Sequence, residues 1–357
     1  MKLSPPVYNS LVLFYEFNGE TQPRIPEISN HLKTSLSEVL TLFYLYPLAG
    51  RVKDNKFIDC NDEGKPYLEA QVKNCKLADI LKNPIPEELN KFVPFELDDT
   101  ANEYALGIQL NIFECGGFAI GQCVSHKLAD GSSYFMFSKT WDAIALGVSG
   151  DHSHAEINRP EFISANLFPP KDLTGYINPS IASITKNKVT KRFVFDASNI
   201  EVLRVKYGGN AGLEKDEKRP SRVEVLSAFI WSRFVAVTKD TGAAEKLYMV
   251  IHAVNLRSRI DPPLPEHSFG ILYRVARTIS INPSFLINST YYYIRRRILL
   301  WSDKAGSPAR TFKNLVHFLD TKEGDGIEAY ICLEKEVMAK FETDSEFLAY
   351  VNPNDVC

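Results

Sequence analysis

Cysteine is scarce in this chain, and its cysteines form no recognisable pair. The 357 residues include six of them, and no two stand in a C-x-x-C arrangement. Disulfide frameworks and zinc sites both depend on closely spaced cysteines, or on cysteines with histidines, so neither is indicated. We expect no bound metal and a reducing compartment, most simply the cytosol.

Charge of one sign and long apolar runs are also lacking. The net charge is −3, whereas nucleic-acid-binding chains usually carry a basic excess, so no DNA or RNA partner is expected. The densest basic cluster, Arg295–Arg297, follows Tyr291–Tyr293 in a segment interpreted as a helix. A solvated helix face explains this cluster better than base stacking does. No secretory signal or membrane span is found, so no membrane partner is expected.

Three widespread motifs are missing as well. The sequence contains no G-x-G-x-x-G, no P-loop and no G-x-S-x-G elbow. A dinucleotide fold, an NTP-binding fold and a serine nucleophile of that type are therefore not indicated. The length and the 45% of hydrophobic residues predict two domains, each large enough for its own core.

The most informative segment that is present is Ser125–Gly131. It places His126 after an apolar, strand-like run, with Asp130 four residues later and Gly131 next to it. Histidine titrates near neutral pH, so it suits proton abstraction. Of the seven histidines, only His126 has an aspartate four residues on. This spacing alone is weak evidence, because a satisfied structural histidine is common at a strand end.

The apolar pattern predicts interleaved strands and helices in the first half of the chain. A helix is expected from Pro26, and the two-residue period of Leu106–Ile112 predicts a half-buried strand in a hairpin with Phe118–Val124. Two strands are expected on either side of the turn Asn61–Gly64. The strands expected in this half are Val7–Phe17, Lys56–Cys60, Pro66–Val72, Leu106–Ile112 and Phe118–Val124.

The second half repeats this alternation after a stretch rich in proline and poor in periodicity. We expect an N-terminal domain over 1–165, a crossover loop over 166–190 and a C-terminal domain over 191–357. Ser221 and Glu224 fit a capping box at the start of a helix, and a short helix is expected from Glu334. The strands expected in this half are Arg192–Asp196, Lys246–Val254, Asn314–Leu319 and Gly326–Leu333.

Several further residues have both a functional and a structural interpretation. Ser221 and Arg222 begin a helix, where backbone N–H groups favour anions, but plain capping needs no ligand. Asp151–His154 with Glu156 resembles a metal cluster, although a solvated polar loop explains it better. Cys115 and Cys123 are expected to be core residues.

Taken together, several motifs in the same order resemble the plant BAHD acyltransferases, in particular their vinorine synthase-like branch. The resemblance extends almost from end to end, which makes it far more specific than His126 and Asp130 alone. The matching segments are Tyr46–Arg51, Asp59–Gly64, Phe113–Gly117, Ser125–Gly131, Asn255–Arg259 before Pro262–Pro265, and Asp320–Ala329.

The resemblance implies an α/β fold with mixed sheets, in which two domains of the chloramphenicol acetyltransferase type enclose a central channel. Acyl-CoA and the acceptor would enter from opposite faces, and His126 would be the general base. Asp130 would point away from the reacting centre and pair with Arg257, supporting the motif together with Gly131. Ser221 and Arg222 match the place where relatives bind a CoA phosphate, and the family points to a monomer.

Two departures from the family pattern stand out. The family opens with a strand segment of which Met1–Ser4 resembles only the end. Its second signature, Asp-Phe-Gly-Trp-Gly, is absent, and the C-terminal domain is expected to be shortened near 298–301. We therefore expect lower stability and weaker acyl-CoA binding than in full-length relatives.

The resulting hypothesis is an acyl-CoA-dependent O-acyltransferase, with acetyl as the expected acyl group. Its acceptor would be a hydroxyl of a plant specialised metabolite such as an alkaloid, and transfer would be direct, without an acyl-enzyme. Acyl-CoA is the only cofactor-like molecule expected, as a co-substrate. The alternative is a truncated, catalytically inactive BAHD-like protein, and a histidine-dependent hydrolase is a distant third.

Overall fold

The computed structural model of the chain divides into two compact units, each assembled from separated segments. Unit 1 comprises Met1–Thr185, Leu256–Leu272 and Ile298–Phe312, and the remaining segments form unit 2. The sequence led us to expect two continuous domains joined by a crossover loop at 166–190. That expectation did not include the two later segments that belong to unit 1. The structure describes residues 4, 6–16, 25–43, 48, 50–53, 57–60, 63–96, 103–147, 159–169, 187–208, 219–239, 248–280, 292–294, 304–309, 312–321 and 324–352.

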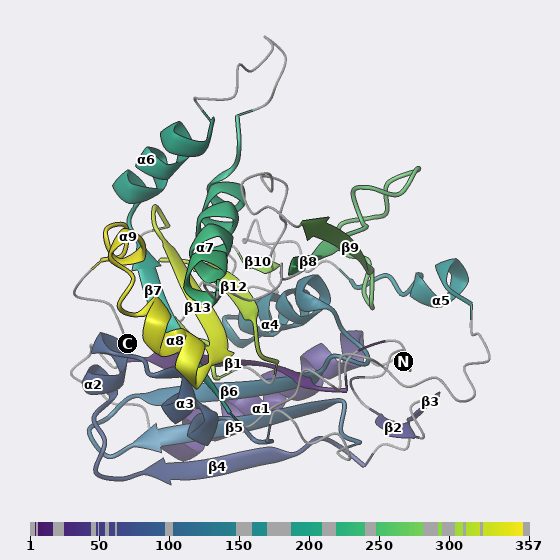
Figure 1. The fold of residues 1–357 in the computed structure, drawn as a ribbon. Coiled ribbons are helices and arrows are strands. Elements are labelled where there is room, and N and C mark those ends of the chain that lie inside the picture. Colours follow the sequence, from purple (N-terminus) through teal and green to yellow (C-terminus); the bar gives the residue numbers. More distant parts are fainter. Residues whose placement is uncertain are drawn as a thin grey trace. The chain divides into compact units, whose positions relative to one another are not determined.

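Unit 1 is built on a mixed sheet with the strand order β11-β1-β6-β5-β4 (Figure 1). Neighbouring strands are antiparallel except β4 and β5, which are parallel. The predicted hairpin of β5 and β6 is confirmed, and the glycines of its turn have positive φ angles, which glycine adopts without strain. The strands are β1 (Tyr8–Tyr15), β4 (Tyr67–Val72), β5 (Leu106–Phe113), β6 (Phe118–Ser125) and β11 (Lys304–Gly306).

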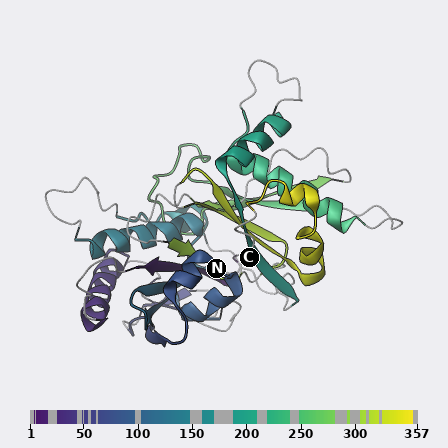
Figure 2. The same cartoon turned by 90° about the vertical axis from the view of Figure 1, so that its left-hand side faces the viewer.

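Helices cover both faces of this sheet. Helices α1 (Ile25–Leu42) and α4 (Gly131–Ala145) pack side by side on one face (Figure 2). On the other face, α2 (Leu77–Lys82), α3 (Pro86–Leu89) and the 3₁₀ turn η2 (Asn90–Phe92) pack against β1 and β6. Consequently every residue of β5 is buried, and the prediction of a half-buried strand is wrong.

The segments on either side of Asn61–Gly64 do not pair with each other. Instead β3 (Phe57–Asp59) pairs with β2 (Arg51–Lys53) in a two-stranded ribbon, and β4 joins the large sheet beside β5. A two-stranded ribbon is marginally stable in water, whereas a strand beside the buried β5 satisfies its backbone groups and gains packing. The two strands expected on either side of this turn are therefore present, and each pairs with a different neighbour.

Unit 2 has its own sheet, with the order β10-β12-β13-β7, and its own core. One face of this sheet packs against four helices through aromatic side chains such as Phe193, Phe229 and Phe347. The strands are β7 (Lys188–Phe195), β10 (Tyr292–Ile294), β12 (Leu315–Asp320) and β13 (Ile327–Glu334), and the helices are α6 (Ala197–Gly208), α7 (Arg222–Thr238), α8 (Lys335–Phe341) and α9 (Ser345–Leu348).

Two other parts of the second half complete the description. Strands β8 (Tyr248–Asn255) and β9 (Tyr273–Ser280) form a separate antiparallel ribbon in unit 2, and a short helix, α5 (Ser164–Leu167), lies in unit 1. The helix predicted to include Tyr291–Tyr293 is wrong over Tyr292–Ile294, because this segment is β10, parallel to β12. Consecutive aromatic residues favour a strand. Arg295–Arg297 lies outside the described residues.

Candidate active site

His126 stands directly after β6, a strand flanked on both sides by β1 and β5. Its backbone N–H donates to the carbonyl of Val7 at 2.9 Å, which continues the pairing of β6 with β1 past the strand end. A short turn follows, in which Leu128 N donates to Ser125 O at 3.0 Å, and α4 then begins at Gly131. The residue is 7% exposed, so its imidazole is held in a largely dry environment.

Asp130 ends this turn and caps α4. Its carboxylate Oδ1 accepts from the backbone N–H of Ser133 at 2.9 Å, which satisfies one of the free donors of the first helical turn. Arg257 binds the same carboxylate with both terminal nitrogens, Nη1 to Oδ2 at 2.9 Å and Nη2 to Oδ1 at 3.1 Å. Leu272 N supplies the fourth donor, to Oδ2 at 2.9 Å. Each carboxylate oxygen thus accepts two hydrogen bonds.

The pair of Asp130 and Arg257 is a buried one, since the two residues are 3% and 5% exposed. Both belong to unit 1, because Leu256–Leu272 is one of its segments. Arg257 Nε also donates to the carbonyl of Ser268 at 2.9 Å. Charged groups in a dry interior need this degree of pairing, and a bidentate arginine fixes direction as well as distance. The arrangement holds the turn after His126 in shape.

Ser133 is a third member of this cluster that sequence reasoning missed. Its hydroxyl donates to Gly270 O and accepts from Gly270 N and from Arg257 Nη2, all at 2.9 Å. Gly270 has a φ of 134°, and a Cβ there would lie 2.7 Å from the hydroxyl of Ser164. The only available signal was a serine three residues after a capping aspartate, which a helix start explains equally well.

Ser221 and Arg222 lie in unit 2, at the start of α7. The expected capping box is present, with Glu224 N donating to Ser221 Oγ and Ser221 N donating to the Glu224 carboxylate. The guanidinium of Arg222 donates to Asp320 Oδ1 at 3.1 Å and to the carbonyl of Asp325 at 2.7 Å. Arg222 is therefore oriented by the Asp320 carboxylate and by the Asp325 backbone carbonyl, contacts that the sequence did not predict.

The remaining candidates from the sequence have simpler roles or lie outside the description. Cys123 is fully buried, and burial raises the pKa of its thiol, in line with a core residue. Cys115 is exposed in the turn after β5, so the expectation of a core position is wrong there. Within the described ranges no group of side chains could hold a metal ion, and no helix is long and apolar enough to cross a bilayer. Asp151–His154 and Glu156 lie outside those ranges.

The chain is similar to known proteins over most of its length, and this similarity shows its family. The family model described as the Transferase family matches residues 2–295. A limonoid 21-O-acetyltransferase of Melia azedarach is 33% identical over 99% of this chain and 92% of its own length. The chain belongs to this family, the BAHD acyltransferases. It is accordingly an acyltransferase.

Other BAHD relatives support the same assignment. Stemmadenine O-acetyltransferase of Catharanthus roseus is 30% identical over 94% of this chain and 88% of its own. The crystal structure of vinorine synthase is 28% identical and superposes with a TM-score of 0.80, covering 98% of this chain and 92% of that one. The TRI101 complex of F. sporotrichioides with coenzyme A and T-2, at 17% identity and a TM-score of 0.73, shares the fold. The expected fold, two domains with mixed sheets, is thereby confirmed.

This BAHD acyltransferase is shorter than the relatives with which it aligns. The alignment with the limonoid 21-O-acetyltransferase extends over 409 positions, and this chain has 357 residues. At least 52 residues of the limonoid acetyltransferase, the difference between these two numbers, therefore have no counterpart in this chain. The family model ends its match at residue 295.

Proposed function

We propose that this chain transfers an acyl group, most simply acetyl, from acyl-CoA to a hydroxyl group of a plant specialised metabolite such as an alkaloid. The observation that carries the proposal is the position of His126, a buried histidine after a central strand, on a turn that Asp130 and Arg257 hold. The names of the relatives, O-acetyltransferases of limonoids and of stemmadenine, support an acetyl donor and an alcohol acceptor.

In the proposed reaction, His126 acts as the general base. A hydroxyl is a poor nucleophile at neutral pH, so the imidazole takes its proton while the oxygen attacks the thioester carbonyl. The tetrahedral intermediate then loses CoA as the C–S bond breaks, and the imidazolium returns the proton to the thiolate. No acyl-enzyme forms. We propose the backbone N–H of Gly131 as one donor to the oxyanion, a role worth about 3–4 kcal/mol when well placed.

Acyl-CoA is held, in this proposal, with help from Ser221 and Arg222. The start of α7 offers backbone N–H groups and a positive dipole end, which favour a phosphate. The contacts of Arg222 with Asp320 and Asp325 keep its guanidinium beside this helix start. Acyl-CoA is a co-substrate rather than a resident cofactor. Action as a monomer in the cytosol stays a prediction.

Replacing His126 tests the proposal directly. We expect His126→Ala to lower the release of CoA thiol from acetyl-CoA, with a panel of alcohols as acceptors, by roughly 10²-fold to 10⁴-fold. The folded structure, followed by circular dichroism, should stay unchanged. His267→Ala removes a partly exposed imidazole from the same unit and serves as the control with unaltered turnover. Comparable thiol release by His126→Ala and the parent chain would refute the role of His126.

A second candidate, a catalytically silent BAHD-like protein, is favoured by one observation. At least 52 residues of the aligned limonoid acetyltransferase have no counterpart in this chain. A silent protein would neither bind CoA nor release its thiol with any alcohol. Mass spectrometry of CoA retained by the folded protein, beside the transfer assay, separates the two candidates.

A further inference from the structure

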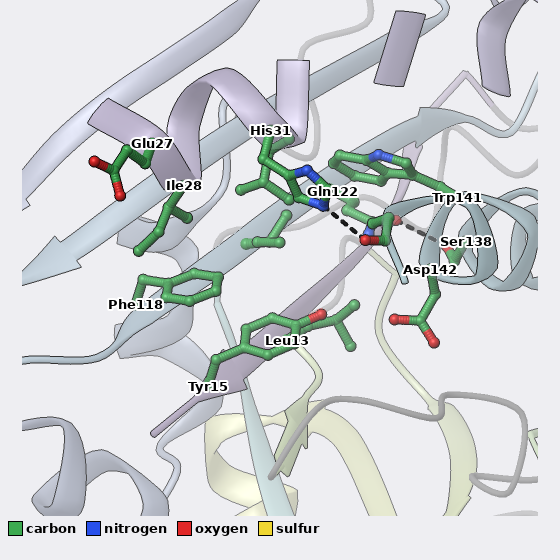
Figure 3. A pocket seen from close by; sticks show the side chains of 13 residues that line it. Leu13, Tyr15, Glu27, Ile28, His31, Phe118, Gln122, Ser138, Trp141 and Asp142 are labelled. Atoms are coloured by element: carbon green, nitrogen blue, oxygen red, sulfur yellow. Dashed lines mark hydrogen bonds between the residues drawn. The ribbon is translucent and has the colours of Figure 1, made fainter. Parts of the chain in front are cut away.

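A partly open cavity lies in unit 1, between the sheet and the two helices that cover it. Its volume is about 290 Å³, and β1, β6, α1 and α4 all contribute to its walls (Figure 3). Protein interiors are normally packed with few voids larger than a water molecule. We refer to this space, bounded by Leu13, Ile28, Phe118, Ile120, Gln122 and Trp141, as the α1–α4 cavity.

The α1–α4 cavity is separate from the candidate active site. Along β6 it is lined by Phe118, Ile120 and Gln122, whereas His126 follows the opposite end of the strand. At about 3.3 Å per residue, Gln122, the lining residue of β6 nearest to His126, lies roughly 13 Å from it along the strand. Along α4 the cavity meets only the second half, starting at Ser138, while Asp130 caps the first turn. Neither His126 nor Asp130 lines it.

The walls combine a large apolar surface with a few polar side chains, Gln122 among them. Phe118 stacks on Tyr15, with ring centroids 4.7 Å apart, to form one wall. Gln122 is 1% exposed, and its carboxamide oxygen accepts from Ser138 Oγ at 2.8 Å. In the described part of the chain its carboxamide nitrogen has no hydrogen-bond partner. This N–H group can be reached from the cavity, so it can donate to an acceptor bound there.

The charged residues of the cavity select against anions. Glu27 and Asp142 belong to the lining, and no lysine or arginine is found among the described lining residues. His31 Nε2 donates to the carbonyl of Ala145 at 2.6 Å and so joins α1 to the end of α4 at this cavity. An anionic ligand such as CoA would therefore find two acidic residues and no lysine or arginine among the described residues of the rim.

We propose that the α1–α4 cavity is a second ligand site, which binds a compact, uncharged lipophilic molecule with a single carbonyl oxygen. The apolar walls take the hydrocarbon body, and the carbonyl accepts from the Gln122 carboxamide. The volume sets the size: a dry cavity of about 150 Å³ holds a benzene molecule, so twice that volume admits roughly a dozen non-hydrogen atoms. The site is distinct from the one that performs acyl transfer.

Three matched probes test this proposal by isothermal titration calorimetry on the full chain. Camphor has a compact hydrocarbon body and one ketone, bornane lacks the ketone, and camphor-10-sulfonate adds an anion. We expect camphor to bind at one site per chain, bornane at least tenfold more weakly, and the sulfonate not at all. Acetyl-CoA at saturating concentration should leave camphor binding unchanged, and His126→Ala should bind camphor like the parent chain.

Variants locate the site. Gln122→Leu should remove the preference for camphor over bornane, and Ile28→Trp, which fills the cavity from the half-buried face of α1, should lower camphor affinity at least tenfold. The controls are Gln109→Leu, a buried glutamine on the other face of the sheet, and Val205→Trp, an exposed residue of α6. No camphor binding by the parent chain, unchanged binding by Ile28→Trp, or displacement of camphor by acetyl-CoA would each overturn the proposal.

Discussion

At the scale of single residues, the turn after His126 depends on charges placed in a dry environment. Removing two ions from water is costly, and only close pairing with further hydrogen bonds offsets that cost. Asp130 and Arg257 meet this condition with two direct contacts and with donors from Ser133 and Leu272. The pair therefore positions His126 through the backbone.

We expect Arg257→Met to lower the free energy of unfolding by about 3–5 kcal/mol, because it leaves a buried carboxylate without its cation. Turnover should also fall, by roughly 10²-fold, because a displaced turn misplaces His126, the proposed base. Urea unfolding and the thiol-release assay measure the two effects. Lys33→Met breaks an exposed pair with Glu69 and should cost about 1 kcal/mol or less. Equal destabilisation by the two variants would contradict the account.

Lys65 provides a test of pH dependence at the same scale. Burial, aided by the charge of Arg51, lowers the pKa of Lys65 to about 8, and its Nζ donates to the carbonyl of Gly50 at 2.6 Å. Between pH 8 and 10.5 the unfolded chain keeps a proton that the folded chain has released, so stability rises with pH in this window. Lys65→Met should remove this rise.

The measurement compares the free energy of unfolding at pH 7 and at pH 9.5 in variant and parent. Cys123 acts in the opposite direction, because burial raises the pKa of its thiol, so only the difference between the two chains reports on Lys65. Lys139→Met, at an exposed position of α4, is the control. A Lys65→Met profile that parallels the parent would show that Lys65 titrates normally.

At the scale of elements, β6 is the strand on which the site is built, and Gly121 determines how closely its neighbours approach. A Cβ at Gly121 would lie 1.8 Å from the carbonyl oxygen of Phe92 in η2, a backbone atom that cannot move alone. We expect Gly121→Ala to cost about 3 kcal/mol or more, measured by thermal unfolding. Gly64→Ala, where only the positive φ of 76° opposes a side chain, should cost about 1 kcal/mol. Similar melting temperatures for the two variants would count against the close packing of η2 on β6.

Local elements were predictable from the sequence, because their signals are local. The two-residue period of Leu106–Ile112 and the glycines after it predict the β5–β6 hairpin, and Ser221 with Glu224 predicts the start of α7. The position of His126 after a strand and before a helix follows from the same patterns. These features require no contact distant in sequence.

Partners distant in sequence were not predictable in this way. The parallel pairing of β4 with β5 and the burial of both faces of β5 depend on helices elsewhere in the chain. Arg257 lies 127 residues after Asp130, and only the family resemblance suggested their contact. Ser133 was missed because a serine in a first helical turn is ordinary, whereas its bonds to Gly270 depend on a segment 137 residues away.

At the scale of the whole molecule, one of the segments that the two units exchange begins close to the place where the sequence predicts a shortened C-terminal domain. Ile298–Phe312 brings β11 into the sheet of unit 1, and the family signature was expected just before Trp301. In unit 2 the ribbon of β8 and β9 leaves Met249, Ile251 and Val275 exposed, at 49%, 55% and 46%. A two-stranded ribbon with an exposed apolar face is marginally stable by itself.

If the block predicted to be absent near 298–301 covers this apolar face in the relatives, adding it should stabilise unit 2. We expect a chimera that carries the corresponding residues of the limonoid 21-O-acetyltransferase between Ile298 and Trp301 to unfold at a higher urea concentration. It should also bind less of an apolar dye, because burying one such side chain is worth about 1.5–3 kcal/mol. Affinity for CoA, measured by calorimetry, should rise in parallel. A glycine–serine insert of equal length controls for the added chain and should do neither. If the unaltered chain already unfolds cooperatively and binds CoA as tightly as the chimera, the absent block is dispensable here, and the expectation of a weakened second domain is wrong.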